Sequence, residues 1–193
     1  MGKEGDAMIS ILDTAKNFLL PVLRPDAVAA DFTMGNGNDT LFLARHLTKG
    51  RIYAFDLQKS ALHNTRSLLE KNSLAERVVL IHDTHVRLLH YIDCQLDAGM
   101  FNLGFLPGSD KKVHTQPDSS LSAVKDALSL LRIGGLLSVL IYPGDEMGRQ
   151  EEQILLSFTE TLPAKCFDVA LVRIWNVKRS PFFLGFEKRQ ELR

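Results

Sequence analysis

The sequence has few cysteines, no net charge and no long apolar run. Its two cysteines, Cys94 and Cys166, fall in apolar segments without metal-ligand residues nearby, which favours reduced core thiols over disulfides or a metal centre. No apolar stretch approaches the ~18 residues of a membrane span. The N-terminus also lacks the apolar segment of a signal peptide. We therefore predict a cytoplasmic protein with no membrane partner and no bound metal.

Charge and length narrow the class of protein further. The 193 residues include 23 lysines and arginines and 23 aspartates and glutamates, so the overall charge indicates neither nucleic-acid nor membrane binding. A local basic patch is still compatible with this balance. The chain is long enough to bury a sizeable core and has no internal repeat or linker composition, so we expect a single domain over residues 1–193.

The most informative stretch lies between the first predicted strand and the helix after it. A short apolar run ends at Asp31, a turn follows through Gly35 and Gly37, and a helical pattern starts at once. The two glycines permit positive φ and a close approach of a ligand, and the free amides of the new helix would face that ligand. We expect Asn38 or Asp39 to cap this helix. The stretch predicts a cofactor loop, although two glycines by themselves also fit a plain turn.

The residues around this loop indicate which cofactor it holds. A dinucleotide fingerprint needs a third glycine, and Thr40 stands at that position, which argues against a nicotinamide oxidoreductase. Asp31 and Asp39 at the two ends of the loop suit the amino group and the sulfonium of S-adenosylmethionine, and they would repel a pyrophosphate. We therefore predict S-adenosylmethionine as the cofactor.

Apolar runs alternate with amphipathic patterns along the rest of the chain. The order predicts an α/β fold: a Rossmann-like, doubly wound, mostly parallel sheet with an antiparallel C-terminal strand. The predicted helices cover residues 8–23, the segment after the glycine loop, 60–72, 117–131 and 151–162; the predicted strands cover 28–31, 51–55, 78–81, 98–103, 136–142, 167–174 and 182–187. We expect Gly134 and Gly135 to end the fourth helix, and the first helix to lie beside the first strand at the cofactor mouth.

Acids follow the second and third predicted strands. Asp56 lies about 20 residues beyond the glycine loop, where nucleotide folds place an acid on the ribose hydroxyls. A cap for the following helix is the alternative role. Asp83 is placed to bind the adenine amino group, with Thr84 and His85 lining the pocket, and for His85 a turn or capping role is the alternative. Together with Asp39 in the first loop, these acids favour an adenosine-bearing cofactor.

Asn102 ends the fourth predicted strand. Because ligands of open α/β sheets bind beyond the carboxyl ends of the strands, this side chain should face the transferred group. Its amide offers both a donor and an acceptor. Phe105, in the next loop, could stack on a planar substrate. The alternatives are that Asn102 braces the turn and that Phe105 belongs to the core.

Three segments resemble a known family. Asp31–Thr40, Phe101–Lys111 and Tyr142–Gly144 resemble the YtqB-like group of class I methyltransferases, once labelled rRNA methylases and now associated with methylation of 5-aminomethyl-2-thiouridine at the tRNA wobble position. The resemblance covers nearly the whole chain, and the Asn-Leu-Gly-Phe-Leu-Pro-Gly motif is specific to this group. Two positions depart from it, since the group usually has Ala in place of Phe32 and His in place of Asp145.

The resemblance implies a Rossmann-like enzyme that methylates a primary amine on RNA, with the tRNA anticodon stem-loop as its partner, and it allows a homodimer. Asn102 and Tyr142 are the catalytic candidates. The cofactor candidates are Asp31, Gly35, Asn36, Gly37, Asn38, Asp39, Thr40, Asp56, Gln58, Asp83, Thr84, His85 and Asn102. The substrate candidates are Phe105, Leu106, Pro107, Gly108, Lys111, Lys112, Pro143, Trp175, Lys178 and Arg179, with Arg173 as a further phosphate contact. Alternatives are methylation of rRNA or of a small-molecule amine, and a non-enzymatic adenosyl-binding module.

Overall fold

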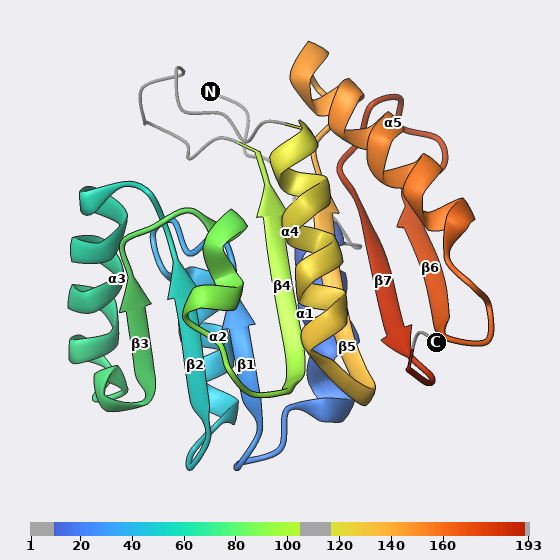
Figure 1. Ribbon diagram of the computed structural model, residues 1–193. Coiled ribbons are helices and arrows are strands. Elements are labelled where there is room, and N and C mark those ends of the chain that lie inside the picture. Colours follow the sequence, from blue (N-terminus) through green and yellow to red (C-terminus); the bar gives the residue numbers. More distant parts are fainter. Residues whose placement is uncertain (1–9, 105–116, 192–193) are drawn as a thin grey trace.

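A single mixed sheet runs through the part of the chain that the computed structural model describes, residues 10–104 and 117–191 (Figure 1). Its seven strands lie in the order β3-β2-β1-β4-β5-β7-β6. They are β1 (Val28–Asp31), β2 (Arg51–Phe55), β3 (Val78–Ile81), β4 (Leu96–Leu103), β5 (Leu131–Ile141), β6 (Phe167–Arg173) and β7 (Phe182–Lys188). β1 to β5 pair in parallel, and β7 is antiparallel to both of its neighbours. The predicted mostly parallel sheet with an antiparallel C-terminal strand is confirmed.

Helices cover both faces of this sheet. They are α1 (Ile11–Leu19), α2 (Asn38–His46), α3 (Lys59–Lys71), α4 (Pro117–Leu130) and α5 (Glu146–Thr161), with short 3-10 helices η1 (Leu20–Val22), η2 (Ala75–Arg77) and η3 (His85–His90). One apolar cluster joins η3, α4 and α5 to the face of the sheet turned toward the viewer in Figure 1. A second cluster joins α1, α2 and α3 to the other face. None of the described helices is long and apolar enough to cross a membrane.

The central strands are apolar on both faces, as strands covered by helices on both sides must be. β4 is buried along nearly its whole length, and Asn102 is its one residue that is only half-buried. Because β1 to β5 run in parallel, their carboxyl ends meet at one edge of the sheet, toward the top of Figure 1. The polar residues that follow these strands therefore gather at that edge, which we call the carboxyl edge.

The first helix is shorter than predicted and packs elsewhere. The side chain of Ser10 accepts a hydrogen bond from the Asp13 amide at 3.1 Å and caps the helix, which gives way to a 3-10 turn around Pro21. The predicted first turn at residues 8 and 9 lies outside the described residues. α1 packs on β5 and β7 rather than beside β1, with Ala15 in contact with Leu140 in the apolar cluster there.

The prediction that Gly134 and Gly135 end the fourth helix is wrong. α4 ends at Leu130, and the glycines lie inside β5, at a shift in register against β4. Gly134 has a φ of 75°, and a Cβ at Gly135 would lie 3.0 Å from the carbonyl oxygen of Leu96. The pair therefore allows the strand to bend close to its neighbour, which is a second common use of glycine in strands.

Other differences concern β5, α5 and the segment after β3. β5 begins at Leu131, five residues before its predicted start. α5 begins at Glu146 instead of residue 151, because the Asp145 side chain accepts a hydrogen bond of 2.9 Å from the Gly148 amide and caps the helix. The segment after β3 forms the 3-10 helix η3, which the sequence pattern did not indicate. The remaining predicted strands and α3 agree with the structure to within a few residues.

Candidate active site

The glycine loop joins β1 to α2 at the carboxyl edge. Gly35 and Gly37 have φ values of 50° and 83°, in the left-handed region that favours glycine. Gly37 is itself the N-cap of α2, and no side chain among the described residues caps the helix, so the predicted caps, Asn38 and Asp39, are wrong. A Cβ at Gly37 would lie within 2.9 Å of Thr65 on α3. The loop is thus held tightly against α3, with Asn36 and Asn38 exposed and Thr40 buried.

Asp56 follows β2 and ties the loop to that strand. One carboxylate oxygen accepts a hydrogen bond of 3.0 Å from the Gly35 amide, and the other accepts one of 2.8 Å from the Gln58 amide. Burial raises the pKa of Asp56, and the two backbone hydrogen bonds oppose that rise. Asp56 therefore positions both the loop and the start of α3. Each oxygen has a second lone pair, so the predicted contact with a ribose stays a compatible prediction.

Asp31, the last residue of β1, is completely buried. Its carboxylate accepts hydrogen bonds from the Thr33 amide at 3.1 Å and from the Thr40 hydroxyl at 2.6 Å. Burial raises the pKa of this carboxyl to about 7, and the nearby charge of Asp39 acts in the same direction. Asp31 thus supports the loop from the interior, and its contact with a ligand stays a prediction.

Asp39 lies in the first turn of α2 and pairs with a cation from α1. The Lys16 ammonium is 2.8 Å from its carboxylate, and the side chains of Lys16 and Asp39 are only 20% and 13% exposed. The amide nitrogen of Asn102 is 3.4 Å from the other carboxylate oxygen. A small cavity of about 10 Å³ lies beside these three side chains, between α1, β4 and β5. The first helix therefore reaches the carboxyl edge at Asp39 and Asn102, and its predicted position at the cofactor mouth stays a compatible prediction.

Asn102 and Tyr142 come together at the ends of β4 and β5. Their side chains are hydrogen-bonded to each other; burial raises the pKa of the Tyr142 hydroxyl to about 12, and the charge of Asp39 also acts in that direction. The backbone amide of Asn102 donates a hydrogen bond of 2.7 Å to the Thr33 hydroxyl in the loop after β1. This hydrogen bond fixes the backbone of Asn102 to the loop after β1. The Asn102 side chain is not needed for that contact and remains able to contact a ligand. Tyr142 is a neutral phenol at physiological pH.

Asp83, after β3, is already engaged within the chain. Its oxygens accept hydrogen bonds of 2.8 Å from the Thr84 amide and from the Tyr91 hydroxyl, and Arg87 is 3.1 Å away. These hydrogen bonds lower the pKa of Asp83, with the Tyr91 hydroxyl as the main cause. Asp83 is therefore a carboxylate at neutral pH, held where the prediction places the adenine, and its contact with adenine stays a prediction.

His85 is half-buried and is the first residue of η3, where Thr84 is the N-cap. Burial lowers its pKa to about 4, against the effect of a hydrogen bond to the Phe32 carbonyl, so the ring is neutral. The buried Nε2 atom has no hydrogen-bond partner among the described residues. The ring packs edge-on against Phe101 at 5.7 Å, and Phe32 stacks on Phe101 at 4.4 Å. Phe32, one of the two positions that depart from the YtqB-like group, therefore packs in this aromatic cluster next to His85 and Phe101.

The predicted substrate residues are only partly described. Phe105, Leu106, Pro107, Gly108, Lys111 and Lys112 lie outside the described residues. Pro143 is buried at the end of β5. The β6–β7 loop presents Trp175, which is 94% exposed, together with exposed Lys178 and Arg179. Because β6 runs parallel to β5, this loop also belongs to the carboxyl edge.

Arg173 does not behave as an exposed phosphate contact. Its guanidinium pairs with Glu152 on α5 and lies 4.1 Å from the centre of the Phe182 ring. These contacts occupy the cation within the fold, because both the carboxylate and the ring face compete with a phosphate for it. The prediction for Arg173 is therefore corrected to a structural role between α5 and β7.

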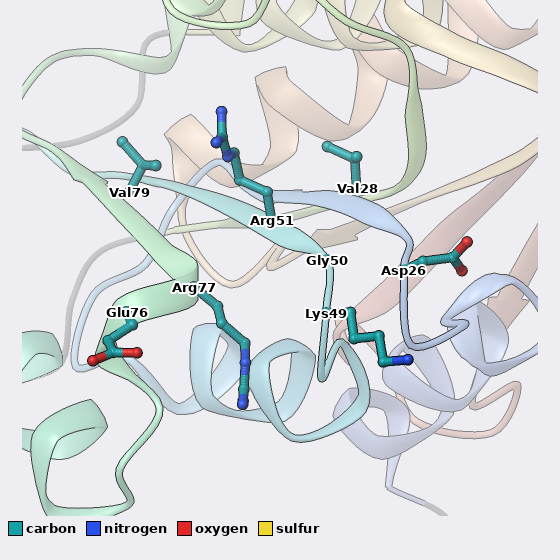
Figure 2. Close-up of a pocket in the computed structure, with 8 residues that line it drawn as sticks. All are labelled: Asp26, Val28, Lys49, Gly50, Arg51, Glu76, Arg77 and Val79. Carbon is teal, nitrogen blue, oxygen red and sulfur yellow. The ribbon is translucent and has the colours of Figure 1, made fainter.

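A larger hollow of about 530 Å³ lies at the opposite, amino edge of the sheet (Figure 2). It is lined by Asp26, Val28, Lys49, Gly50, Arg51, Glu76, Arg77 and Val79. Figure 2 shows that Arg51 and Arg77 point to opposite sides of the ribbon, so these charges do not converge on a ligand. Ligands of such sheets bind at the carboxyl edge, where the loops with buried acids lie, and size alone does not make this hollow the site.

Sequence reasoning missed Lys16 and Thr33. Both act across long sequence separations, Lys16 on Asp39 and Thr33 on the Asn102 amide. A weak signal was present for Lys16, since it directly follows the buried Ala15 of α1, next to the apolar face. Among the described residues, no group of three or more His, Cys, Asp or Glu side chains could hold a metal ion.

The chemistry of the carboxyl edge fits a cationic nucleoside cofactor. It combines the glycine loop, in which Gly35 and Gly37 have positive φ, with three carboxyl groups, namely Asp31 at the end of β1, Asp39 in the first turn of α2 and Asp56 after β2. Such a donor set favours positive charge and disfavours the phosphates of a dinucleotide. These residues would hold the cofactor through its ribose and its ammonium.

Three proteins of similar sequence are described as methylases or methyltransferases, and one of them was solved with a product of this cofactor. A chloroplastic tRNA (mnm5s2U34)-methyltransferase from Arabidopsis thaliana is 32% identical over 180 residues, which are 88% of this chain and 66% of that protein, so the chain spans about two thirds of its length. A crystal structure described as a "putative rRNA-methylase" from Clostridium thermocellum is 35% identical, with a TM-score of 0.91 over 94% of this chain and 99% of that one. A "putative methyltransferase" from Streptococcus mutans, solved with SAH (S-adenosylhomocysteine), is 37% identical, with a TM-score of 0.85 over the same shares.

Membership of a family follows from a match over most of the sequence. Residues 52–187 fit the family model described as "Putative rRNA methylase". This segment begins in β2 and includes Asn102 near the end of β4 as well as the polar residues that follow β2, β3 and β5, namely Asp56, Asp83 and Tyr142. The chain belongs to this family and is a methyltransferase that uses S-adenosylmethionine.

Proposed function

We propose that the protein methylates the 5-aminomethyl group of uridine or 2-thiouridine at the wobble position of tRNA. The observation that carries this proposal is the 32% identity to a tRNA (mnm5s2U34)-methyltransferase over 88% of this chain. The polar pair at the ends of β4 and β5, Asn102 and Tyr142, supports the proposal because it suits an amine acceptor.

S-adenosylmethionine supplies an electrophilic methyl group next to a positively charged sulfur. The protein has to hold an acceptor amine in line with that methyl group, in its neutral form, and positioning of this kind is worth ~7–11 kcal/mol. We assign this role to Asn102, whose amide carbonyl can accept a hydrogen bond from the amine and direct its lone pair. Tyr142 remains a neutral hydroxyl because burial raises its pKa, so it can orient Asn102 without taking up the proton.

Binding of the anticodon stem-loop is assigned to the β6–β7 loop. A wobble base can stack on an exposed aromatic side chain, and the phosphates on either side of it attract cations. Trp175 is almost completely exposed, and Lys178 and Arg179 follow it within the same loop. This arrangement supports RNA rather than a small amine, which would have no use for an exposed aromatic residue next to two cations.

The test is the modification state of tRNA in a strain that lacks the gene. Nucleoside mass spectrometry should show 5-aminomethyl-2-thiouridine in place of its N-methylated form. The purified protein with S-adenosylmethionine should then add one methyl group to tRNA from that strain. Loss of a methylated rRNA nucleoside, with unchanged tRNA, would instead support the rRNA alternative, and unchanged tRNA and rRNA together would point to a small-molecule amine.

A further inference from the structure

We propose that Lys16 and Asp39 together bind the amino-acid end of the cofactor, with Lys16 contacting its carboxylate and Asp39 its ammonium. The proposal rests on S-adenosylmethionine as the cofactor and is independent of the RNA substrate. Lys16 is thereby assigned a binding role on the first helix, outside the segment that matches the family model.

The position of Lys16 is fixed by the packing of α1. Ile11, Ala15 and Leu19 are buried, and Ile11 and Ala15 pack with Leu140 and Phe183 of the sheet. This packing directs the next residue, Lys16, toward the carboxyl edge, where its ammonium lies 2.8 Å from the Asp39 carboxylate. Only a fifth of the side chain is exposed, so Lys16 is a constrained cation and not a solvated surface lysine.

The charges at this edge require such a cation. The amino-acid end of S-adenosylmethionine carries a carboxylate as well as an ammonium. The protein places three carboxyl groups at this edge, Asp31 at the end of β1, Asp39 at the start of α2 and Asp56 after β2. A ligand carboxylate among these acids would be repelled unless a positive side chain lay beside it. Of the described ion pairs, Lys16–Asp39 is the one that brings a cation to these three acids.

The ion pair and the ligand are complementary. The zwitterion of an amino acid has its ammonium and its carboxylate on the same carbon, and an ion pair of 2.8 Å presents the opposite charges at a similar spacing. Docked side by side, the four charges alternate in sign, and both protein groups keep a partner throughout. Asn102 also contacts Asp39, at 3.4 Å, which connects this subsite to the place where the methyl acceptor arrives.

Lys16 could instead occupy the place of the ligand ammonium in the structure without ligand, and this role predicts the opposite effect of removing it. If Lys16 only occupied the place of the ligand ammonium, its removal would free Asp39 and tighten binding. If it bound the ligand carboxylate, its removal would weaken binding, and only for ligands that have a carboxylate. The two roles therefore differ in the sign of the effect.

The experiment measures the affinity of two probes by calorimetry. One is S-adenosylhomocysteine, and the other is its decarboxylated analogue, which keeps the nucleoside, the thioether and the ammonium. Wild-type protein should bind S-adenosylhomocysteine roughly tenfold or more tightly than the analogue, as expected for one charge-assisted contact. Lys16→Met should lose this preference by weakening S-adenosylhomocysteine while leaving the analogue within about twofold.

Lys49→Met is the matched control, because Lys49 is an exposed lysine at the amino edge (Figure 2). It should keep the full preference of the wild type. Binding of the analogue and the thermal unfolding of each variant without ligand report whether the pocket is intact. The proposal is overturned if Lys16→Met keeps the preference, binds S-adenosylhomocysteine more tightly, or loses affinity for both probes equally together with thermal stability.

Discussion

The amide of Gly35 donates a hydrogen bond of 3.0 Å to the carboxylate of Asp56. This contact connects the glycine loop after β1 to the end of β2, across 21 positions of the sequence. The acid that sequence reasoning assigns to the ribose thus also shapes the loop that faces the cofactor. Removing the Asp56 carboxylate should therefore abolish a contact with the ribose and also loosen the glycine loop, and two different substitutions can separate these effects.

Asp56→Ala should weaken S-adenosylmethionine by ~2–3 kcal/mol, the range for loss of a charge-assisted hydrogen bond with its buried partner left behind. Asp56→Asn keeps an acceptor for the Gly35 amide and should recover part of the loop order, but not the full affinity. Calorimetry with both variants measures the two effects. Asp26→Ala, an exposed acid at the amino edge, is the control. Equal affinity in wild type and Asp56→Ala would exclude the ribose contact.

The stability of the fold should depend on pH through Asp31. Its pKa is raised by burial from 3.8 to about 7, so the native state holds a proton that the unfolded chain releases above pH ~4. The free energy of unfolding should therefore fall as the pH rises from about 4 to 7, by on the order of 4 kcal/mol, and this contribution should be flat above that range. Urea unfolding at several pH values measures the slope. Asp31→Asn should remove this decrease, and a variant with the wild-type slope would contradict the assignment.

Asn102→Ala should slow methyl transfer by ~10²-fold or more, the scale for one positioned polar group, with little change in cofactor or RNA binding. The brace to the Thr33 hydroxyl comes from the backbone amide and should survive this change. Thr33→Val is the matched variant, since it removes the brace and should lower the melting temperature while Asn102 remains. Near-normal single-turnover transfer in Asn102→Ala would remove this residue from the catalytic set.

Charge removal in the β6–β7 loop should weaken RNA binding. Lys178→Ala with Arg179→Ala should reduce the slope of log affinity against log salt by about 1.5, since each phosphate contact contributes about 0.7–0.9. The affinity for S-adenosylmethionine should not change. Lys49→Ala with Arg51→Ala, at the amino edge, is the charge-matched control. An unchanged slope in the loop variant would point to a small-molecule substrate or to another RNA-binding surface.

Trp175→Ala should lower RNA affinity without changing the salt slope, because stacking involves no counterion release. The expected loss is ~1–3 kcal/mol, as for one base stacked on an aromatic side chain. Trp175 is 94% exposed, so the change should leave the melting temperature unaltered. Filter binding at two salt concentrations separates this effect from that of the two cations. Unchanged affinity would mean that the wobble base stacks elsewhere.

The sequence by itself determined the local features of this protein. The apolar run 78–81 predicted a parallel strand, which is confirmed, but the burial it predicted is wrong, because β3 lies at the edge of the sheet and only Ile81 of it is buried. The short run that ends at Asp31 with two glycines after it predicted a strand, a turn and a helix start, as found, and also a cofactor loop. Acids after successive strands predicted the kind of cofactor. The strands, the turn and the class of cofactor were predictable because hydrophobic periodicity and glycine geometry act over a few residues, and because parallel strands bring their carboxyl ends to one edge whatever their order. The contacts of the loop and of the acids with the cofactor stay predictions.

Only the tertiary structure decided which distant residues meet. The antiparallel strand β7 lies between β5 and β6, and Gly134 and Gly135 lie inside β5 rather than after α4. Likewise, no local pattern connects Lys16 of α1 to Asp39 of α2, a contact that exists because α1 packs across β5 and β7. Strand pairing and the packing of helices on a sheet depend on surfaces formed by residues far apart in sequence. The pairing of Lys16 with Asp39 could therefore be identified only from the tertiary structure.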